Sequence, residues 1–445
     1  MKKCFIINSV ISIITQLILF PNVSSQLTRF AFTFSSSGTR NPSNLSPSNK
    51  DIFGKSRLSG HSSLTSVGKR QQFLLGRYIR TKYSQLISDE YDPREIFISA
   101  TDDNHTIQSA YAQIRGLYPF SPELTPIQLK NAVPPNCSLN ISSLNNKTLP
   151  DDIMIIPVHT FYEKDHSFEL YKVSNCPNIK NDLDKIYNNS NTKQLITNIT
   201  NEHHNTIETL LNTSEMNVTY THIVNNVSIF EVFVDTVISS YKNGYFNNNT
   251  EYERLYRSCL TFKTLFSFRK GDYCFVKKAV SPTLAKIVHW MNTTVNNNNN
   301  TVTSLRYVGY IAHRTSLDLM LSYFEHTFNC TAVDEHVEHS SILTVDLVED
   351  VSGGASNYYV LASYNDDLLF KVSLSEFIDV INNNTVSDEE IYSYCNWQVE
   401  KLEFDNYIIY SLLLLIVFVS AFTVCVQKVI PRRHFSKKGE TAPIN

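Results

Sequence analysis

Cysteines and N-glycosylation sequons are the groups in this chain whose type and spacing indicate chemistry most directly. The chain has 8 cysteines, and Cys4 and Cys425 lie in the apolar stretches near its two ends. The other six can close three disulfides in fifteen connectivities, and they are Cys137, Cys176, Cys259, Cys274, Cys330 and Cys395. None of the six belongs to a Cys-x-x-Cys pair of the kind that binds zinc, so we predict structural disulfides and no metal site.

Fifteen Asn-x-Ser/Thr sequons follow residue 25. They begin at Asn44, Asn104, Asn136, Asn140, Asn146, Asn188, Asn198, Asn212, Asn217, Asn226, Asn248, Asn292, Asn299, Asn329 and Asn383. Because 43 residues of the chain are Asn, part of this number is expected by chance. The sequons therefore support a lumenal or extracellular compartment without assigning a glycan to any one of them.

Both ends of the chain have the pattern of a membrane-targeted protein. A short basic region and an apolar run to about residue 20 precede the small residues Val23 and Ser25, so residues 1–25 are predicted to be a signal peptide. The uncharged run 407–427 would rise about 31 Å as a helix, which matches the hydrocarbon core of a bilayer. Basic residues follow in 428–445, which predicts a cytoplasmic tail and a single-pass type I topology.

The composition excludes several classes of protein. With 445 residues, 42% of them hydrophobic, the chain is long enough for two or three domains with a packed core, so it is no disulfide-stabilised mini-protein. Its formal net charge of −3 argues against a nucleic-acid binder that acts through bulk positive charge. We predict a globular, polar ectodomain with no cofactor and no nucleic-acid partner.

Strands and helices alternate in the first part of the chain. The aromatic residues of 27–34 recur at period two, which predicts a strand that stops in the Ser-rich residues 35–38. A helix is predicted at 65–82, with Thr65 as its N-cap and with Phe73, Leu74 and Tyr78 on one face. A second strand and a second helix are predicted at 95–98 and 106–117. This order predicts an α/β fold, a three-layer core with a mostly parallel sheet flanked by helices.

The middle of the chain is rich in Asn and interrupts this pattern. Its longer periodic segments, 229–241 and 283–291, are predicted helices of an inserted, mostly helical cap. Strand patterns return at 305–312, 341–348 and 357–364, and the last two are predicted to form a hairpin. We therefore expect an ectodomain over 26–400, with its core at about 26–180 and 301–400 and its cap at about 181–300.

Several blocks in the predicted core carry a family resemblance. They are TSVGKRQ at 65–71, YDPREIF at 91–97, TDDNHT at 101–106, GLYP at 116–119, IPVHT at 156–160, NCP at 175–177 and YIAH at 310–313. In this order they resemble the histidine acid phosphatases of the histidine phosphatase superfamily, of the prostatic and lysosomal kind. The resemblance runs from about residue 27 to about 395 and is weakest in the cap.

The resemblance implies a covalent mechanism. In that family an Arg-His-Gly-x-Arg-x-Pro signature places a nucleophilic His at the carboxyl end of the first strand, arginines hold the phosphate oxygens, and a His-Asp pair supplies a general acid. A dianionic group is attacked by a neutral nitrogen, so positive charge must be preorganised and a proton delivered to the leaving alkoxide.

The catalytic part of the signature is degenerate in this chain. The signature aligns with residues 36–42, so that Ser37 stands at the position of the nucleophile and Ser36 at that of the first arginine. A further family arginine is aligned with Ser99, and Arg314 stands where the family has the acid. Arg40 and His313 are retained. Loss of a general acid alone costs about a hundred- to ten-thousand-fold in rate, so the resemblance predicts an impaired or inactive enzyme.

Two hypotheses follow for the retained residues. In one, Arg40, His313, Arg314 and His105 form an anion pocket that binds phosphate or a phosphoester without turnover. In the other, Arg40 only pairs with an acidic neighbour, His313 is a satisfied pocket residue and Arg314 points into solvent. By position, Cys176–Cys395 resembles a family disulfide, and a local Cys259–Cys274 pair is also expected.

The predicted function is therefore that of a type I membrane glycoprotein with an acid-phosphatase-like, catalytically impaired ectodomain that binds an anion or another partner. An active lysosomal-type acid phosphatase and a structural surface glycoprotein are the alternatives. The expected location is the cell surface or the secretory and endolysosomal membranes, and a homodimer is left open. The tail after residue 427 contains no Tyr, which disfavours a tyrosine-based lysosomal sorting signal.

Overall fold

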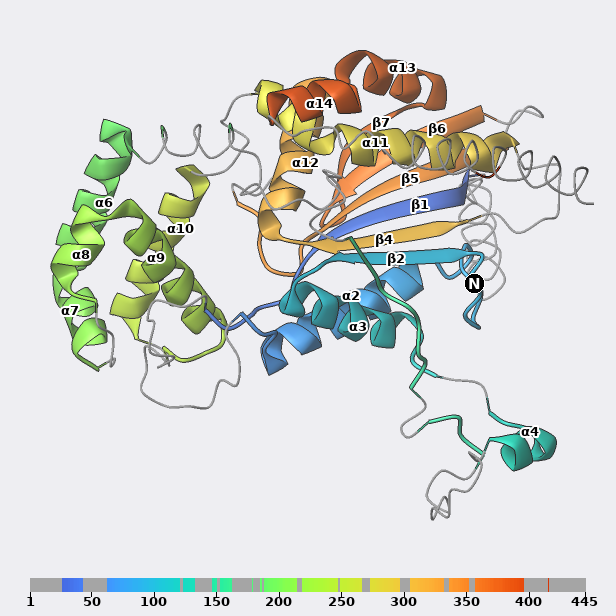
Figure 1. Cartoon of the computed structure of the whole chain (residues 1–445), viewed down its shortest axis with the longest axis horizontal. Coiled ribbons are helices and arrows are strands. Elements are labelled where there is room, and N and C mark those ends of the chain that lie inside the picture. Colours follow the sequence, from blue (N-terminus) through green and yellow to red (C-terminus); the bar gives the residue numbers. More distant parts are fainter. Residues whose placement is uncertain are drawn as a thin grey trace, which may run out of the picture. The chain divides into compact units, whose positions relative to one another are not determined.

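The structure is a computed structural model, and it describes the larger part of the chain (Figure 1). The described residues are 26–42, 62–120, 123–132, 146–149, 153–161, 178, 185, 188–213, 218–246, 249–265, 273–296, 305–331, 336–351, 357–395 and 415. The chain divides into two compact units, Met1–Ile391 and Tyr392–Asn445. The predicted signal peptide lies outside the described residues, and so does the predicted span at 407–427 apart from Leu415.

Within the described residues, no helix has both the length and the apolar composition needed to cross a bilayer.

A seven-stranded mixed sheet forms the centre of the first unit, with the strand order β3-β2-β4-β1-β5-β6-β7. The strands are β1 (Gln26–Ser36), β2 (Ile96–Thr101), β3 (His159–Phe161), β4 (Tyr307–Ala312), β5 (Ile342–Asp350), β6 (Asn357–Tyr364) and β7 (Asp367–Ser373). Strands β1, β2, β3 and β4 are parallel to one another, whereas β5, β6 and β7 form an antiparallel meander that begins next to β1. The prediction of a mostly parallel sheet is therefore wrong for half of the strand pairs.

Short connections explain the antiparallel half. A parallel pair needs a long crossover, but β6 and β7 are joined by only Asn365 and Asp366. Both residues have positive φ, 48° and 73°, which is the backbone of the two-residue turns that favour hairpins. The predicted hairpin of β5 and β6 is confirmed. Strand β7 was missed, although the Asn-Asp turn before it is a recognisable hairpin signal.

Helices cover both faces of the sheet (Figure 1). On one face lie α2 (Ser66–Lys82) and α3 (Asn104–Leu117), and on the other α11 (Tyr273–Asn296), α12 (Arg314–Phe328) and α13 (Leu374–Asn384). The two short helices α4 and α14 are Pro126–Asn131 and Asp388–Tyr394. The three-layer α/β core is thus present. Helix α11, which the sequence placed in the cap, packs its Trp290 against the β1 rings of Phe30 and Phe32, at centroid distances of 6.2 and 6.4 Å.

Strand β1 is buried on both faces, which explains its apolar composition. Phe30, Phe32 and Phe34 are at most 2% exposed, and Tyr310 of β4 contacts Phe32 edge to face at 5.2 Å. Ala31, between these aromatic residues, belongs instead to the core cluster with Ile79 of α2 and Ile114 of α3. Successive side chains of a strand point to opposite faces of the sheet. The aromatic rings therefore pack on one face, and the small side chain of Ala31 lets α2 and α3 pack closely on the other.

Helices α2 and α3 cross at two glycines. Helix α2 begins as predicted at the N-cap Thr65, whose hydroxyl accepts a hydrogen bond from the Gly68 amide at 3.2 Å. Its buried residues are Gly68, Gln72, Gly76 and Ile79, whereas Phe73 and Leu74 are 37% and 53% exposed. A Cβ at Gly76 would overlap the carbonyl oxygen of Gln113 and lie 3.0 Å from the Gly116 Cα. Only glycine permits this close approach of the two backbones.

Five cap helices have a hydrophobic core of their own. They are α6 (Ser190–Glu202), α7 (His204–Thr213), α8 (Tyr220–Asn225), α9 (Val227–Lys242) and α10 (Thr250–Leu265). Their buried residues, such as Ile207, Phe230, Leu255 and Phe262, form one cluster and are fully buried. The predicted helical character of this segment is confirmed.

One disulfide prediction is wrong. Cys259 is a free thiol with 0% exposure inside the cap cluster, so it forms no bond with Cys274. Its side chain faces the packed interior between cap helices, and burial raises the pKa of this thiol far above its ordinary value. Cys330 is also free. Cys395 is disulfide-bonded, and its pairing with Cys176 stays a prediction because Cys176 lies outside the described residues.

Replacing Asp346 with Asn is expected to stabilise the protein at neutral pH. This β5 carboxyl is 8% exposed and accepts a hydrogen bond from the Tyr83 hydroxyl at 2.7 Å. Burial raises its pKa from 3.8 to about 6, so its contribution to stability is full below pH 3.8 and is lost as the pH rises through about 6. We expect Asp346→Asn to raise the free energy of unfolding at neutral pH by about 1.5 kcal/mol.

Urea unfolding at neutral and acidic pH measures this effect. Asp366→Asn is the matched control, because Lys82 Nζ lies 4.0 Å from Asp346 and 3.6 Å from Asp366, and the Asp366 side chain is 62% exposed. An Asp346→Asn variant that is destabilised at neutral pH as much as at acidic pH would contradict the prediction.

Candidate functional site

Polar residues follow three neighbouring parallel strands at the same edge of the sheet. Strand β1 leads into residues 36–40, β2 into Asp103 and His105, and β4 into His313 and Arg314. Because the carboxyl ends of parallel strands meet at one edge, residues far apart in sequence come together there. The cap contributes one side chain to the same place, Asp235 of α9.

His313 contacts a carboxylate from the segment that follows β2. Its Nε2 lies 2.8 Å from Asp103 Oδ2, and both side chains are 23% exposed. The His105 ring lies 5.1 Å from the His313 ring, and His105 is 5% exposed. The residue that follows His313 in sequence is Arg314 and not an acid, but in the fold Asp103 places a carboxylate beside His313.

The two arginines converge on one cap carboxylate. Arg40 donates a hydrogen bond to Asp235 Oδ1 at 2.9 Å, and the Arg314 guanidinium lies 4.0 Å from the same oxygen. The Arg40, Arg314 and Asp235 side chains are 18%, 20% and 9% exposed. Burial lowers the pKa of Arg314, an effect to which Arg40 adds. Two cations share one anion, so this cluster keeps a net positive charge.

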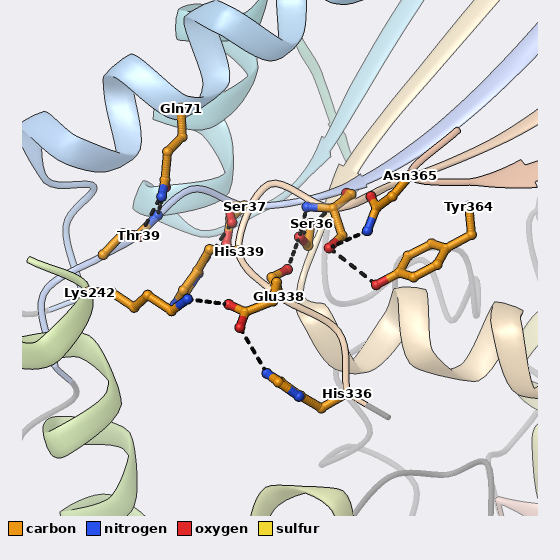
Figure 2. A network of polar contacts seen from close by, with 11 residues as sticks. Ser36, Ser37, Thr39, Gln71, Lys242, His336, Glu338, His339, Tyr364 and Asn365 are labelled. Atoms are coloured by element: carbon orange, nitrogen blue, oxygen red, sulfur yellow. Dashed lines mark hydrogen bonds and ion pairs between the residues drawn. The ribbon is translucent and has the colours of Figure 1, made fainter. Parts of the chain in front are cut away.

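Ser36 and Ser37, at the end of β1, are bonded into the loop that precedes β5 (Figure 2). The Ser36 hydroxyl donates to the Glu338 carbonyl oxygen at 2.7 Å and accepts from the Ser341 amide at 3.0 Å. The Ser37 carbonyl oxygen accepts a hydrogen bond from the Ser340 amide at 3.1 Å. Both residues are at most 3% exposed. Ser36 therefore has a structural role in this loop.

Ser99 is a sheet residue. Its hydroxyl donates to the His159 carbonyl oxygen of β3 at 2.9 Å, and the residue has 0% exposure. The bond stabilises the pairing of β2 with β3, and it directs this side chain toward β3.

His339 is a site residue that sequence reasoning missed. Its Nδ1 contacts the Ser37 carbonyl oxygen at 3.4 Å, as Figure 2 shows. A ring nitrogen that contacts a carbonyl must donate, so Nδ1 carries the proton and Nε2 is an unprotonated acceptor. Nε2 is buried and has no hydrogen-bond partner among the described residues. Burial, with Arg314 and Arg40 nearby, lowers the His339 pKa well below its ordinary value, which keeps the ring neutral.

A second contact joins cap and core beside the arginine cluster (Figure 2). The Glu338 carboxylate lies 2.9 Å from Lys242 Nζ of α9 and 3.0 Å from His336 Nε2. Although burial opposes it, hydrogen bonds from His336 and Lys242 lower the Glu338 pKa to about 2. The Asn243 side chain also donates to the Arg40 carbonyl oxygen at 3.4 Å. These contacts hold the last turn of α9 against the loops of the site.

Two helix N-termini point their partial positive charge at the same place. Helices α3 and α12 begin after the N-caps Asp103 and His313, and neither side chain makes a capping hydrogen bond within the part of the chain that the structure describes. The Asp103 carboxylate bonds to His313 instead. In the first turn of α12, the Ser316 hydroxyl is buried and has no hydrogen-bond partner there either. Uncapped helix N-termini with adjacent arginines favour the binding of an anion.

A metal centre finds no support in the described residues, since no group of three His, Cys, Asp or Glu side chains there could hold a metal ion. What the arrangement offers to an anion is two guanidinium groups and two helix N-termini, which are donors that an anion site requires.

The structure brings together four of the residues singled out from the sequence: Arg40, His105, His313 and Arg314. It also adds Asp103, Asp235 and His339. Asp103 had a signal, because it lies in the short connection between a strand and a helix. Asp235 lies in a cap helix with no motif around it, and no sequence pattern could have placed it beside Arg40.

Replacing His105 with Gln is expected to make stability less sensitive to acid. Burial, with His313 and Arg40 nearby, lowers the His105 pKa from 6.5 to about 3. Between these values the unfolded chain binds a proton that the folded chain does not, so the free energy of unfolding falls as the pH falls. From pH 6.5 to 5 the native chain should lose about 1.5 kcal/mol more than His105→Gln.

Denaturant unfolding across this pH range checks the prediction, with His289→Gln, an exposed residue of α11, as the control. Equal slopes for the native chain and the His105→Gln variant would show that another group causes the acid sensitivity.

Comparison with known proteins identifies the family of this chain. A family model described as "Histidine phosphatase superfamily (branch 2)" matches residues 20–341. Testicular acid phosphatase of Homo sapiens is 43% identical over 60 residues, which are 14% of this chain and 14% of that protein. Lysosomal acid phosphatase of Xenopus laevis is 29% identical over 124 residues, 26% of this chain and 22% of that protein. The matched segments thus span less than a quarter of these relatives.

Solved structures extend the likeness over most of the chain. The apo form of Hafnia alvei phytase has a TM-score of 0.51 at 12% identity and covers 84% of this chain and 98% of its own. The phytase from D. castellii has a TM-score of 0.50 at 12% identity and covers 84% of this chain and 83% of its own. At this identity the likeness shows the fold alone.

Proposed function

Because the chain belongs to branch 2 of the histidine phosphatase superfamily, we propose that its ectodomain binds a phosphate-type anion but hydrolyses phosphate esters poorly. The observation that carries the proposal is the convergence of Arg40 and Arg314 on the single carboxylate of Asp235. That carboxylate is an internal anion held where two guanidinium groups meet, and a phosphate would compete for the same donors.

Poor hydrolysis follows from the residues at the end of β1. A seryl hydroxyl replaces an imidazole at Ser37, and a hydroxyl is a weak nucleophile unless a base removes its proton. The residue is 3% exposed, and the neighbouring Ser36 hydroxyl is bonded into the loop before β5. Loss of one arginine position to Ser36 further reduces the positive charge that would stabilise the transition state.

Hydrolysis of phosphate monoesters is the second candidate, and one observation favours it. The His313–Asp103 pair at 2.8 Å supplies a carboxylate beside an imidazole, the combination that a general acid requires. If another group served as nucleophile, this pair could still protonate a leaving alkoxide.

The compartment is part of the proposal. The targeting pattern of residues 1–25, the apolar run 407–427 and the sequons together support a single-pass membrane glycoprotein whose ectodomain is lumenal or extracellular. Acid phosphatases of the lysosomal and prostatic kinds are among the relatives. A secretory or endolysosomal location therefore fits the family as well as the sequence.

Binding and turnover are measured separately in the decisive experiment. Titration of the purified protein with inorganic phosphate and with vanadate, followed by calorimetry, should give binding at millimolar concentration or better, and Arg40→Ala should abolish it. A p-nitrophenyl phosphate assay at acidic pH should give little or no turnover. Robust turnover that disappears in Arg40→Ala and in His313→Ala would establish the second candidate, and absence of any anion binding would favour a structural surface glycoprotein.

A further inference from the structure

One sequon forms part of the wall of the candidate site. Asn104 is the first residue of α3, and with His105 and Thr106 it makes an Asn-x-Thr sequon. Its neighbour Asp103 pairs with His313, and the middle residue of the sequon is His105, whose ring lies 5.1 Å from the His313 ring. Residues on both sides of Asn104 are therefore site residues.

The three side chains of this sequon point in different directions. Asn104 is exposed, whereas His105 is 5% and Thr106 is 0% exposed. The Thr106 hydroxyl donates to the Thr101 carbonyl oxygen at 2.7 Å, which fixes the start of α3 with Thr106 inward. The Asp103 and His313 side chains are each 23% exposed. The site is therefore open to solvent beside Asn104.

The fold makes no use of the Asn104 amide. The N-cap of α3 is Asp103, and the Asn104 side chain has no hydrogen-bond partner among the described residues. A sugar on its nitrogen therefore breaks no contact. Sequons are modified on the extended chain before folding, so burial of Thr106 in the folded protein is no obstacle. A bulky, hydrophilic group is tolerated where the side chain already faces solvent.

We propose that Asn104 carries an N-linked oligosaccharide that stands at the rim of the site and covers the exposed side of His313. The proposal rests on the secretory route proposed above. A polar glycan at this point admits small ligands such as inorganic phosphate and hinders large ones such as phosphoproteins. Other exposed sequon residues, at Asn188, Asn198, Asn212, Asn226, Asn329 and Asn383, have no site residue as their neighbour in sequence.

Site-specific mapping of glycans tests the attachment. The full chain is expressed in eukaryotic secretory cells, deglycosylated enzymatically in heavy-oxygen water and digested, so that each former glycan site becomes an isotopically labelled Asp. Asn104 should be labelled in the native chain and in Thr106→Ser, which keeps the sequon and the buried hydroxyl. Asn104→Gln should migrate as a protein smaller by one glycan. Label at other sequons with none at Asn104 would overturn the proposal alone, whereas no label anywhere would also overturn the secretory route.

Hydroxyl-radical footprinting tests the position of the glycan. Oxidation of the peptide that contains His313 should be faster in Asn104→Gln than in the native chain, and Asn198→Gln, which removes a sequon from α6, should leave it unchanged. Equal oxidation in the native chain and in Asn104→Gln would show that the glycan does not cover the site. Neither readout depends on anion binding, so failure of phosphate to bind would overturn the proposed function and leave this inference standing.

Discussion

Replacing Asp235 with Asn is expected to tighten phosphate binding about thirtyfold. The Asp235 carboxylate accepts a hydrogen bond from Arg40 at 2.9 Å and lies 4.0 Å from Arg314, so an incoming anion must displace it from both guanidinium groups. A hydrogen bond to a charged group contributes about 2 kcal/mol, and this corresponds to about a thirtyfold change in Kd. The neutral amide keeps the shape of the side chain and removes the competing charge.

Calorimetric titration with phosphate measures this effect, and α9 offers a matched control. Glu231 lies one turn earlier on the same helix and pairs with Lys263 at 3.2 Å. Glu231→Gln changes the net charge by the same amount and should leave the Kd unchanged. Thermal unfolding adds a second readout: without phosphate, Asp235→Asn should be less stable than the native chain because Arg40 and Arg314 then face each other uncompensated. Weaker phosphate binding in Asp235→Asn would show that this carboxylate supports the ligand and does not compete with it.

Replacing Gly76 with Ala is expected to destabilise the protein by more than about 3 kcal/mol, beyond the usual range for overpacking. The added methyl group would overlap the carbonyl oxygen of Gln113, which is backbone of α3 and cannot rotate away. Gly116 on the facing helix is equally close, since a Cβ there would overlap the Phe73 carbonyl oxygen. The two helices would have to separate, and α3 carries Asp103 and His105 at its start.

Urea unfolding measures the loss, and Arg77→Ala is the control. Arg77 is the next residue of α2 and is exposed, so alanine there changes the helix by one solvent-facing side chain. We expect that control to remain within about 0.5 kcal/mol of the native chain. Because α3 supports the site, Gly76→Ala protein that still folds should also bind phosphate more weakly. A Gly76→Ala variant as stable as the control would mean that the helices are farther apart than in the structure.

Both predictions concern contacts that also explain how the site is built. The glycine crossing, near the C-terminal end of α3, holds that helix against α2, and the Asp235 and Lys242 contacts fix α9 of the cap over the loops of the core. A site of this kind depends on the cap, because one of its charged groups, Asp235, comes from there. The proposed anion site is therefore a property of the core and the cap together.

Local patterns in the sequence determined much of the fold. Thr65 was identifiable as an N-cap because its hydroxyl accepts a hydrogen bond from an amide only three residues away. Strand β1 was identifiable from its alternating aromatic residues, and the β5–β6 hairpin from two strand patterns separated by a short turn. The blocks resembling the acid phosphatases located Arg40 and His313. In each case, the residues that determine the structure are close together in sequence or belong to one recognisable motif.

The pairing of charged residues and the burial of Cys259 depend on contacts between residues far apart in sequence, which local patterns could not predict. The His313–Asp103 bond joins residues 210 positions apart, and the Arg40–Asp235 bond joins residues 195 apart. The sequence placed an arginine where the family has an acid beside His313, and only the parallel arrangement of β2 and β4 shows that Asp103 supplies a carboxylate there. Cys259 looked available for a disulfide, yet the packing of α10 turns it into the cap core. Sequence fixes residue types and local backbone preferences, but charge pairing and burial depend on which elements pack together, and that is decided only in the folded chain.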